Sequence, residues 1–241
     1  MPIINQVVSG GGSAPATQYG VNFKGWCGDV NNGQIRTDQA VGTLSMPGLT
    51  YIAEYLFKYK FKGSTGLVGT VNLPDVVDIS DFGMYEAFAN TNITGVNLGN
   101  NGYIMASGLE GAFKGTQITT ITINCGLGFS QSSFNDMCKN CSQLRHVYLN
   151  IPASLFTDYA DSIGSTSIED DVIPGVFYNM ISGCTNCTVH FIQDIWQDWN
   201  QWYTDIGETP PYSTAQDWGA AILPYLGGGT GNSVVFDINP S

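Results

Sequence analysis

Charged side chains are scarce in this chain, and their scarcity excludes several classes of protein. Only 12% of the 241 residues are Asp, Glu, Lys or Arg, about half of the share that is usual in globular proteins. The chain has 8 Lys and Arg against 20 Asp and Glu, a formal net charge of −12. Because nucleic-acid binding needs clustered Lys and Arg, we expect no nucleic-acid partner. Its 30 Gly and many Asn, Thr and Ser predict a polar but uncharged surface.

Other signals are missing as well. No run of 18 apolar residues occurs, so we expect no membrane insertion. The first cation is Lys24, which leaves the N-terminus without the basic region of a secretory signal peptide. The glycine-rich stretch 227–231 lacks the Lys-Ser/Thr ending of a phosphate loop and predicts a turn before a strand at 234–237. No motif that activates a nucleophile is present. We therefore expect a protein that is not an enzyme and has no cofactor.

A repeated segment is the strongest feature that the sequence does contain. Residues 88–98, 113–123 and 138–149 share an apolar residue, a small polar corner, and apolar residues at positions i, i+3 and i+5. The last apolar residues of successive units fall at 73, 98, 123 and 149, a step of 25 or 26 residues. A fixed period in this range predicts a solenoid.

Each unit is expected to contribute a short strand with one buried face. The buried set should comprise Val96, Leu98, Ile121, Ile123, Val147 and Leu149, with Val68, Val71 and Leu73 one unit earlier and Val189 and Phe191 in a later, decayed copy. The apolar residues Phe88 and Phe113 should cover this core from the return arm. Met84, Leu109 and Phe134 precede the apolar position by four residues, which suits a helical turn.

The pattern Ala-Phe-x-Gly-x-x-Ile-x-x-Ile-x-Ile at 112–123 closely resembles the BspA-type leucine-rich repeats. The resemblance covers about half of the chain, and it departs at Cys138 and in a long insertion at 150–176. It implies an α+β, β-rich repeat solenoid with a broad surface for recognition or adhesion. We divide the chain into an attachment peptide and linker (1–15), a strand-rich capping region (16–60), the solenoid (61–192), and a Trp-rich helical cap with a final strand (193–241).

The first residues predict an attachment segment. Ile3, Ile4, Val7 and Val8 form a short apolar stretch before a Gly-rich linker, which is typical of a docking peptide that adds a strand to a partner. The opening resembles those of tailed-phage virion proteins, particularly fibre and decoration proteins of gut phages. That resemblance implies virion partners and a homo-oligomer, such as the trimer of many fibres. The alternative is a frayed N-terminal tail, without a binding role, that precedes an ordinary domain.

Residues 55–62 alternate between aromatic and basic side chains. Phe57, Tyr59 and Phe61 fall on one face of an expected edge strand, with Lys58, Lys60 and Lys62 on the other. Lysines on an edge strand discourage edge-to-edge pairing. The alternative is a basic ligand-binding stripe, because three of the eight cations lie here.

Two cysteine pairs allow several interpretations. Cys138 and Cys141 precede His146, and Cys184 and Cys187 precede His190, so a tetrahedral zinc site or disulfides are possible. The repeat register favours a different role, since Cys141 and Cys184 occupy the small corner that holds Thr in neighbouring units. We therefore expect no metal, with buried packing thiols and both histidines on the solenoid surface.

The C-terminal part is expected to be helical. Trp196, Trp199 and Trp202 lie in a short amphipathic helix that caps the solenoid, and the alternative is a carbohydrate platform of stacked tryptophans. A second helix should run from Thr214, as its cap, to Leu223, before a final strand. The acidic residues 169–171 predict a solvated loop rather than a calcium site.

Together these observations predict a non-enzymatic structural protein of a tailed-phage virion, on a head fibre, decoration or tail fibre. It would be assembled in the host cytoplasm without export and would present its repeat surface to a host protein or glycan. The alternatives are a bacterial leucine-rich-repeat adhesin, an intracellular interaction scaffold, and a fragment of a carbohydrate-active enzyme. The last is disfavoured because no acid/base pair is visible.

Overall fold

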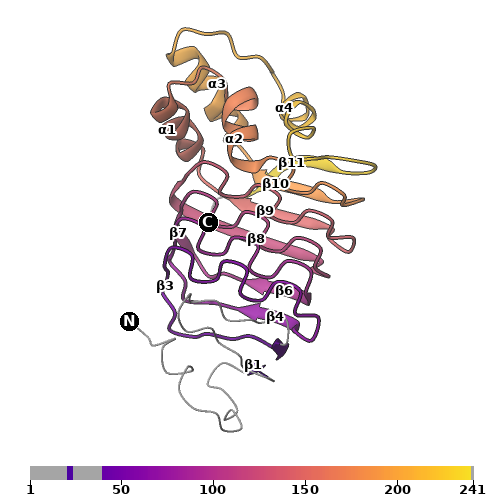
Figure 1. Ribbon diagram of the computed structural model, residues 1–241. Coiled ribbons are helices and arrows are strands. Elements are labelled where there is room, and N and C mark those ends of the chain that lie inside the picture. The colour runs from indigo at the N-terminus through magenta and orange to yellow at the C-terminus, as the bar shows by residue number, and fades with distance from the viewer. Residues whose placement is uncertain (1–20, 24–39, 240–241) are drawn as a thin grey trace.

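A computed structural model describes residues 21–23 and 40–239 of the chain. They form an α/β protein built on a seven-stranded, all-parallel sheet in the order β11-β10-β9-β8-β7-β5-β3 (Figure 1). In chain order its strands are β3 (Tyr51–Ile52), β5 (Asp78–Ile79), β7 (Asn101–Ile104), β8 (Thr120–Phe129), β9 (His146–Asn150), β10 (Thr188–Ile192) and β11 (Ser233–Ile238). Two further strand pairs are antiparallel β1 (Val21–Phe23) with β2 (Ala40–Gly42), and parallel β4 (Val68–Asn72) with β6 (Asn92–Asn97).

The helices gather at one end of the stacked strands, next to β10 and β11 (Figure 1). They are α1 (Ala153–Ile163), the π-helix η2 (Ile168–Val172), α2 (Ile173–Phe177), α3 (Ile195–Asp205) and α4 (Ala215–Ile222). The expected insertion at 150–176 therefore folds into α1, η2 and α2. None of the helices in the described ranges is long and apolar enough to cross a membrane.

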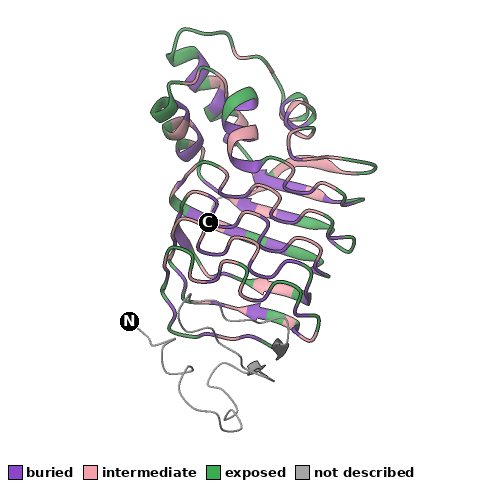
Figure 2. Cartoon of the chain, in the orientation of Figure 1, coloured by how far each residue is buried: buried purple, intermediate pink, exposed green. Residues whose placement is uncertain are grey.

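The strand alternation follows the predicted phase in the middle of the sheet. Ile121 and Ile123 of β8 are buried while Thr122 is exposed, and Val147 and Leu149 of β9 are buried in register beside them. Buried positions occur in the strands, in the helices and in the turns that connect them (Figure 2). The predicted core is thus confirmed at these positions.

Two members of the predicted core behave differently. Val96 is only partly buried, although Leu98 beside it is buried. The side chain of Val68 is 44% exposed, so its assignment to the core is wrong. Strand β4 shifts its register between Gly69 and Thr70, and such a bulge changes which residues face inward. Leu67 is buried instead.

The return arms are runs of tight turns rather than strands or helices. In residues 55–63, N–H groups alternate between two partners: that of Lys58 bonds locally to the Tyr55 carbonyl, and that of Tyr59 bonds to the Tyr85 carbonyl of the next arm. Every fourth residue has a positive φ, at 55, 59 and 63, then 82, 86 and 90, then 107, 111 and 115, then 132, 136 and 140. The prediction of an edge strand at 55–62 is therefore wrong, and so is that of a helical turn at Met84, Leu109 and Phe134.

Aromatic rings stack between successive arms inside the core. The ring of Phe88 lies 5.0 Å from Phe61 and 5.9 Å from Phe113, with interplanar angles of 2° and 9°. Phe134 and Phe177 form a second stack with centroids 4.9 Å apart. The prediction that Phe88 and Phe113 cover the core from the return arm agrees with their complete burial.

One turn position alternates between Asn and Gly along the stack. Asn90 and Gly115 both have positive φ, and a Cβ added to Gly115 would lie 2.4 Å from the Asn90 side-chain oxygen. Asn140 and Gly183 repeat this arrangement, with 2.2 Å at the same contact. Glycine is required at these two positions, because the asparagine of the preceding arm occupies the space of a side chain.

The C-terminal elements match their predictions. Helix α3 covers the predicted Trp-rich helix, and α4 starts after Thr214, whose side chain accepts a hydrogen bond from the backbone N–H of Asp217. The turn at 227–231 leads into β11, which is the predicted final strand. Buried Trp199 and Trp218 pack edge to face with centroids 5.1 Å apart.

Candidate functional site

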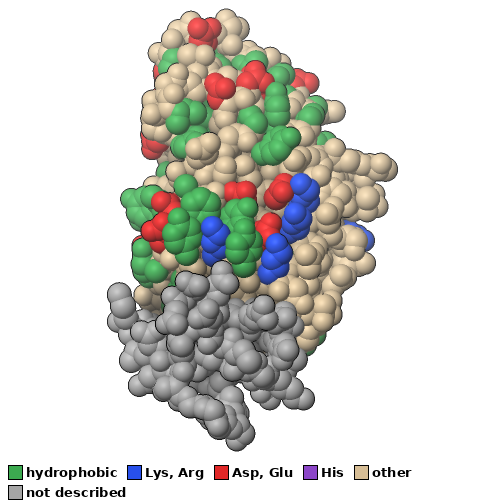
Figure 3. All heavy atoms as spheres, viewed as in Figure 1, with side chains coloured by type: hydrophobic (Ala, Val, Ile, Leu, Met, Phe, Trp, Pro, Cys, Tyr) green, Lys and Arg blue, Asp and Glu red, His purple; other side chains and the backbone are tan. Residues whose placement is uncertain are grey.

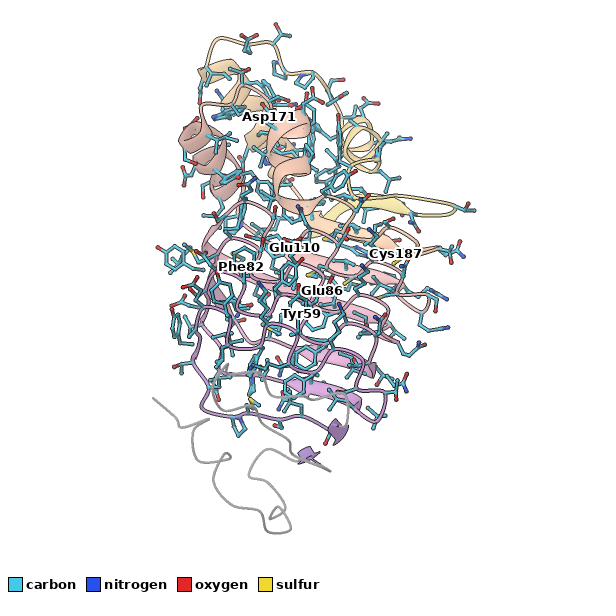
Figure 4. The ribbon with its side chains drawn as sticks, in the orientation of Figure 1. Tyr59, Phe82, Glu86, Glu110, Asp171 and Cys187 are labelled. Atoms are coloured by element: carbon cyan, nitrogen blue, oxygen red, sulfur yellow. The ribbon has the colours of Figure 1, made fainter. Side chains whose placement is uncertain are left out.

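The turn geometry brings the basic and aromatic residues of two neighbouring arms to one surface. We call Tyr55, Lys58, Tyr59, Phe82 and Tyr85 the tyrosine–lysine cluster. In Figure 3, hydrophobic, basic and acidic side chains gather in the middle of one face, and Figure 4 shows Tyr59 and Phe82 in the same area. Tyr55 and Tyr59 both have a positive φ, and both are exposed on the same arm.

Lys58 lies at the centre of the cluster. Its ammonium nitrogen is 4.7 Å from the centroid of Phe82, 4.8 Å from that of Tyr55 and 5.2 Å from that of Tyr85. A cation within about 6 Å of a ring face is attracted to it. The lysine therefore holds rings from two arms around one positive charge.

The rings themselves form a partly open platform. Tyr55 stacks on Phe82 at 5.5 Å and 20°, and Tyr59 meets Tyr85 edge to face at 5.3 Å. Tyr55 and Tyr59 remain 47% and 45% exposed. Such exposure of several adjacent aromatic residues is uncommon and marks a candidate binding surface.

Carboxylates border the platform. Glu86 forms an ion pair with Lys62. Glu110 occupies the position in the next arm that Tyr85 occupies in its own arm (Figure 4). Burial, reinforced by nearby acidic groups, raises the pKa of the Glu110 carboxyl. Burial, together with the charge of Glu110, raises the pKa of Tyr85 to about 12, so its hydroxyl remains a hydrogen-bond donor at neutral pH. The site thus offers ring faces, a cation, hydroxyls and carboxylates within one area.

The three lysines do not form a basic stripe. Lys58 is held over the rings, Lys62 is paired with Glu86, and Lys60 is partly buried, which lowers its pKa. The interpretation as a stripe of free cations is corrected accordingly. The sequence did not predict Tyr55, Tyr59, Phe82 and Tyr85 as members of the site, because residues 55–62 were interpreted as a strand. The four-residue spacing of Tyr55 and Tyr59 was the available signal.

The tryptophans do not form an exposed platform. Trp199 is fully buried, Trp202 is 8% exposed, and Trp196 is partly buried against the core. The indole N–H of Trp202 donates to Asp161 of α1 at 3.0 Å. These residues join α3 to α1 and to the sheet, so the carbohydrate platform proposed for them is wrong.

Cys141 lies at the small corner that Thr116 occupies one unit earlier. The thiol of Cys141 lies 3.0 Å from the Phe113 carbonyl and 3.4 Å from the Thr116 hydroxyl, and Thr116 contacts the same carbonyl at 2.8 Å. All five cysteines of the described residues are buried free thiols. Burial raises the pKa of Cys138, while a hydrogen bond from Cys138 lowers that of Cys141 to about 7. No group of three or more potential ligands fit to hold a metal ion occurs in the described part of the chain.

The acidic residues 169–171 have structural partners instead of forming a solvated loop. Glu169 is buried and accepts a hydrogen bond from the Tyr203 hydroxyl at 2.5 Å. Asp170 accepts one from Tyr225 at 2.7 Å. Asp171, at the helical end in Figure 4, is bound by Ser165. The cluster ties η2 to α3 and to the segment after α4, which corrects the expectation of a loop.

The attachment residues Ile3, Ile4, Val7 and Val8 lie outside the described residues. Comparison of the whole chain with protein-family models, with curated proteins and with solved structures gives no match. The arguments for function therefore rest on the residues and their geometry.

Proposed function

We propose that this chain is a non-enzymatic structural protein of a tailed-phage virion, whose BspA-type leucine-rich-repeat solenoid presents the tyrosine–lysine cluster to a host surface glycan. The single observation that carries the recognition role is the pair of half-exposed tyrosines over a lysine-centred aromatic platform. Only 12% of the chain's residues are charged, and the cluster brings a lysine and four aromatic rings together.

The chemistry of the cluster suits a sugar ring. The apolar face of a pyranose packs on an aromatic ring, and its hydroxyls need donors and acceptors around it. Tyr55 and Tyr59 offer ring surface, Lys58 and Tyr85 offer donors, and Glu110 offers acceptors. A cluster of this kind binds weakly alone, and several copies in one oligomer would bind with avidity.

The solenoid assignment is supported by contacts that recur at the repeat length. Side-chain hydrogen bonds join residues 25 apart, as between Asn97 and Asn72, Ala106 and Asp81, and Asn124 and Gly99. The virion assignment rests on the apolar opening, the glycine linker and the uncharged composition of the sequence. It also includes a homo-oligomer that attaches through its N-terminal residues.

Glycan binding is tested by probing an array of bacterial surface glycans with the full chain. The Tyr55→Ala/Tyr59→Ala variant should lose binding by at least tenfold, whereas Tyr103→Ala, which removes an equally exposed tyrosine from β7, should not change it. Equal binding by all three proteins would overturn the site. Binding to a host protein alone would replace the glycan by a protein ligand at the same surface.

Virion attachment is tested separately by deleting residues 2–12. The shortened protein should keep the Tm of the full chain but fail to enter particles of the phage that encodes it. Normal incorporation would place the anchor elsewhere. A glycan-binding chain that enters no particle would support the alternative of a bacterial adhesin.

A further inference from the structure

The chain contains only two histidines, and the fold brings them together. His146 of β9 and His190 of β10 are 44 residues apart, yet Nδ1 of His146 lies 3.0 Å from Nε2 of His190. The other nitrogen of His190, Nδ1, lies 2.8 Å from Oδ1 of Asp237 in β11. His190 is 8% exposed and His146 is exposed, so the expectation that both histidines lie on the surface is wrong for His190.

The hydrogen-bond partners fix the tautomers of the two histidines. A carboxylate only accepts, so Nδ1 of His190 carries a proton and donates it to Asp237. With both rings neutral, Nε2 of His190 is then an acceptor, and Nδ1 of His146 donates to it. The buried histidine thus directs a lone pair toward its exposed neighbour, and Asp237 sets that direction.

A local irregularity places the carboxylate. The register of β10 with β11 pairs Phe191 with Phe236 and Ile192 with Ile238, leaving Asp237 as the additional residue of a bulge. Bulges re-aim a side chain relative to the regular alternation. Tyr148 stacks on a face of the buried imidazole, its ring centroid 4.3 Å from that of His190. The imidazole is therefore held between a ring and a carboxylate in one orientation.

We propose that His146 and His190 together bind a divalent transition-metal ion such as Ni²⁺, Cu²⁺ or Zn²⁺. Two imidazole nitrogens on one tetrahedral ion at ordinary bond lengths stand about 3.3 Å apart, close to the 3.0 Å between Nδ1 and Nε2 here. On binding, His146 changes tautomer: its proton passes through solvent from Nδ1 to Nε2, so that Nδ1 gains a lone pair and no net proton is released. The exposed ring of His146 then turns so that this lone pair meets the ion, which lies off the line between the two nitrogens.

The hydrogen bond from His190 to Asp237 is the arrangement that metal-binding histidines use. The carboxylate fixes the tautomer and makes the ligating nitrogen more basic. Since no set of three or more protein ligands is present among the described residues, the remaining coordination positions belong to water or to a ligand atom of another molecule. Imidazole nitrogens suit Cu²⁺, Ni²⁺ and Zn²⁺, and exclude Ca²⁺ and Mg²⁺, which prefer oxygen.

The test is calorimetric titration of the full chain with Ni²⁺, followed by electron paramagnetic resonance of the Cu²⁺ complex. We expect about one ion per chain and a spectrum split by nitrogen ligands. The His146→Asn variant, altered at an exposed position, should keep its Tm and lose affinity by at least tenfold. Asp237→Asn should weaken binding about 10- to 100-fold, because it removes the group that orients His190. Asp158→Asn, an exposed carboxylate on α1, is the matched control and should bind like the parent chain.

Two outcomes would overturn the proposal. The first is the absence of any saturable binding by the parent chain. The second is binding that survives in His146→Asn or that lacks nitrogen splitting, which would place the ion at a different site. Loss of binding in His146→Asn with an unchanged Asp237→Asn would retain the metal site but remove the positioning role of the carboxylate.

Discussion

The stacked turns and the helices of this molecule pair their backbone N–H and carbonyl groups in different ways. In the turns, every second N–H bonds to the carbonyl of the next arm, as Glu86 does to Glu110 and Gly111 does to Asn135. Helices α3 and α4 close their hydrogen bonds within themselves. We therefore expect a turn segment to depend on the neighbouring arm for its stability, whereas a helix carries its own hydrogen bonds.

Aromatic packing shows the same difference. Phe88 and Phe113 are nearly parallel, at 9°, because translation along the stack places like residues in like orientations. Trp199 and Trp218 meet at 62°, and they come from two helices, α3 and α4, that are not copies of each other. Rings that are related by translation along the stack lie parallel to one another, whereas rings without such a relation meet edge to face.

The largest expected effects compare these two cores directly. Phe113→Ala and Trp199→Ala should each lower the free energy of unfolding by about 3–5 kcal/mol, because each removes a large, fully buried ring. Their hydrogen-exchange patterns should differ. Phe113→Ala should expose amides in the neighbouring arms at 82–90 and 132–140, and Trp199→Ala should affect mainly 195–222. Identical patterns would show that the two regions unfold as one unit.

The strand phase is tested by neighbouring residues of β8. Ile121→Ala should cost about 2–5 kcal/mol in urea unfolding, because it empties a buried site. Thr122→Ala should cost less than about 0.5 kcal/mol, because that side chain is exposed. Similar costs at both positions would contradict the assigned alternation.

The alternating Asn and Gly of the turns give a smaller effect. Gly115→Ala should cost about 1–3 kcal/mol, since alanine would be strained at a φ of 68° and would contact the Asn90 side chain. Gly175→Ala is the control. It lies in α2 with no heavy atom within 4 Å of the added carbon, so thermal unfolding should show no loss of stability.

The smallest effect is expected at the start of α4. Thr214→Ala should cost about 1 kcal/mol, because it removes the side chain that accepts from the Asp217 N–H at 3.1 Å. Circular dichroism during thermal unfolding would measure it, and Thr214→Ser should restore most of the stability. A loss as large as that of Phe113→Ala would mean that the cap governs the stability of the whole molecule.

The sequence predicts the repeating positions well because each one is set by the same local requirement. The burial of Ile121, Val147 and Phe113, and the cap at Thr214, all follow from spacing or from a known capping preference. The small corner at Cys141 follows from comparison with Thr116 one unit earlier. These predictions needed only the period and the residue types.

Other features depend on contacts that the period does not describe. Residues 55–62 alternate like a strand, but positive φ at Tyr55 and Tyr59 makes them a turn run, and no glycine or asparagine marks those two positions. The burial of Trp199 depends on α1, which lies within an insertion. The meeting of His146 with His190 required the pairing register of β9 and β10.

The direction of the hydrogen bonds between arms has a consequence for how such a molecule can change in length. Each bond runs from an N–H of the earlier arm to a carbonyl of the later one, from Tyr59 to Tyr85 and onward to Asn179 with Tyr225. The hydrogen bonds between the arms therefore point in one direction, so the two ends of the stacked arms are not equivalent. For the proposed solenoid, we therefore expect that a whole unit of about 25 residues can be added or removed while the hydrogen bonds between arms are kept, whereas a fraction of a unit cannot. The surfaces at the two ends of the molecule would then stay the same at different lengths.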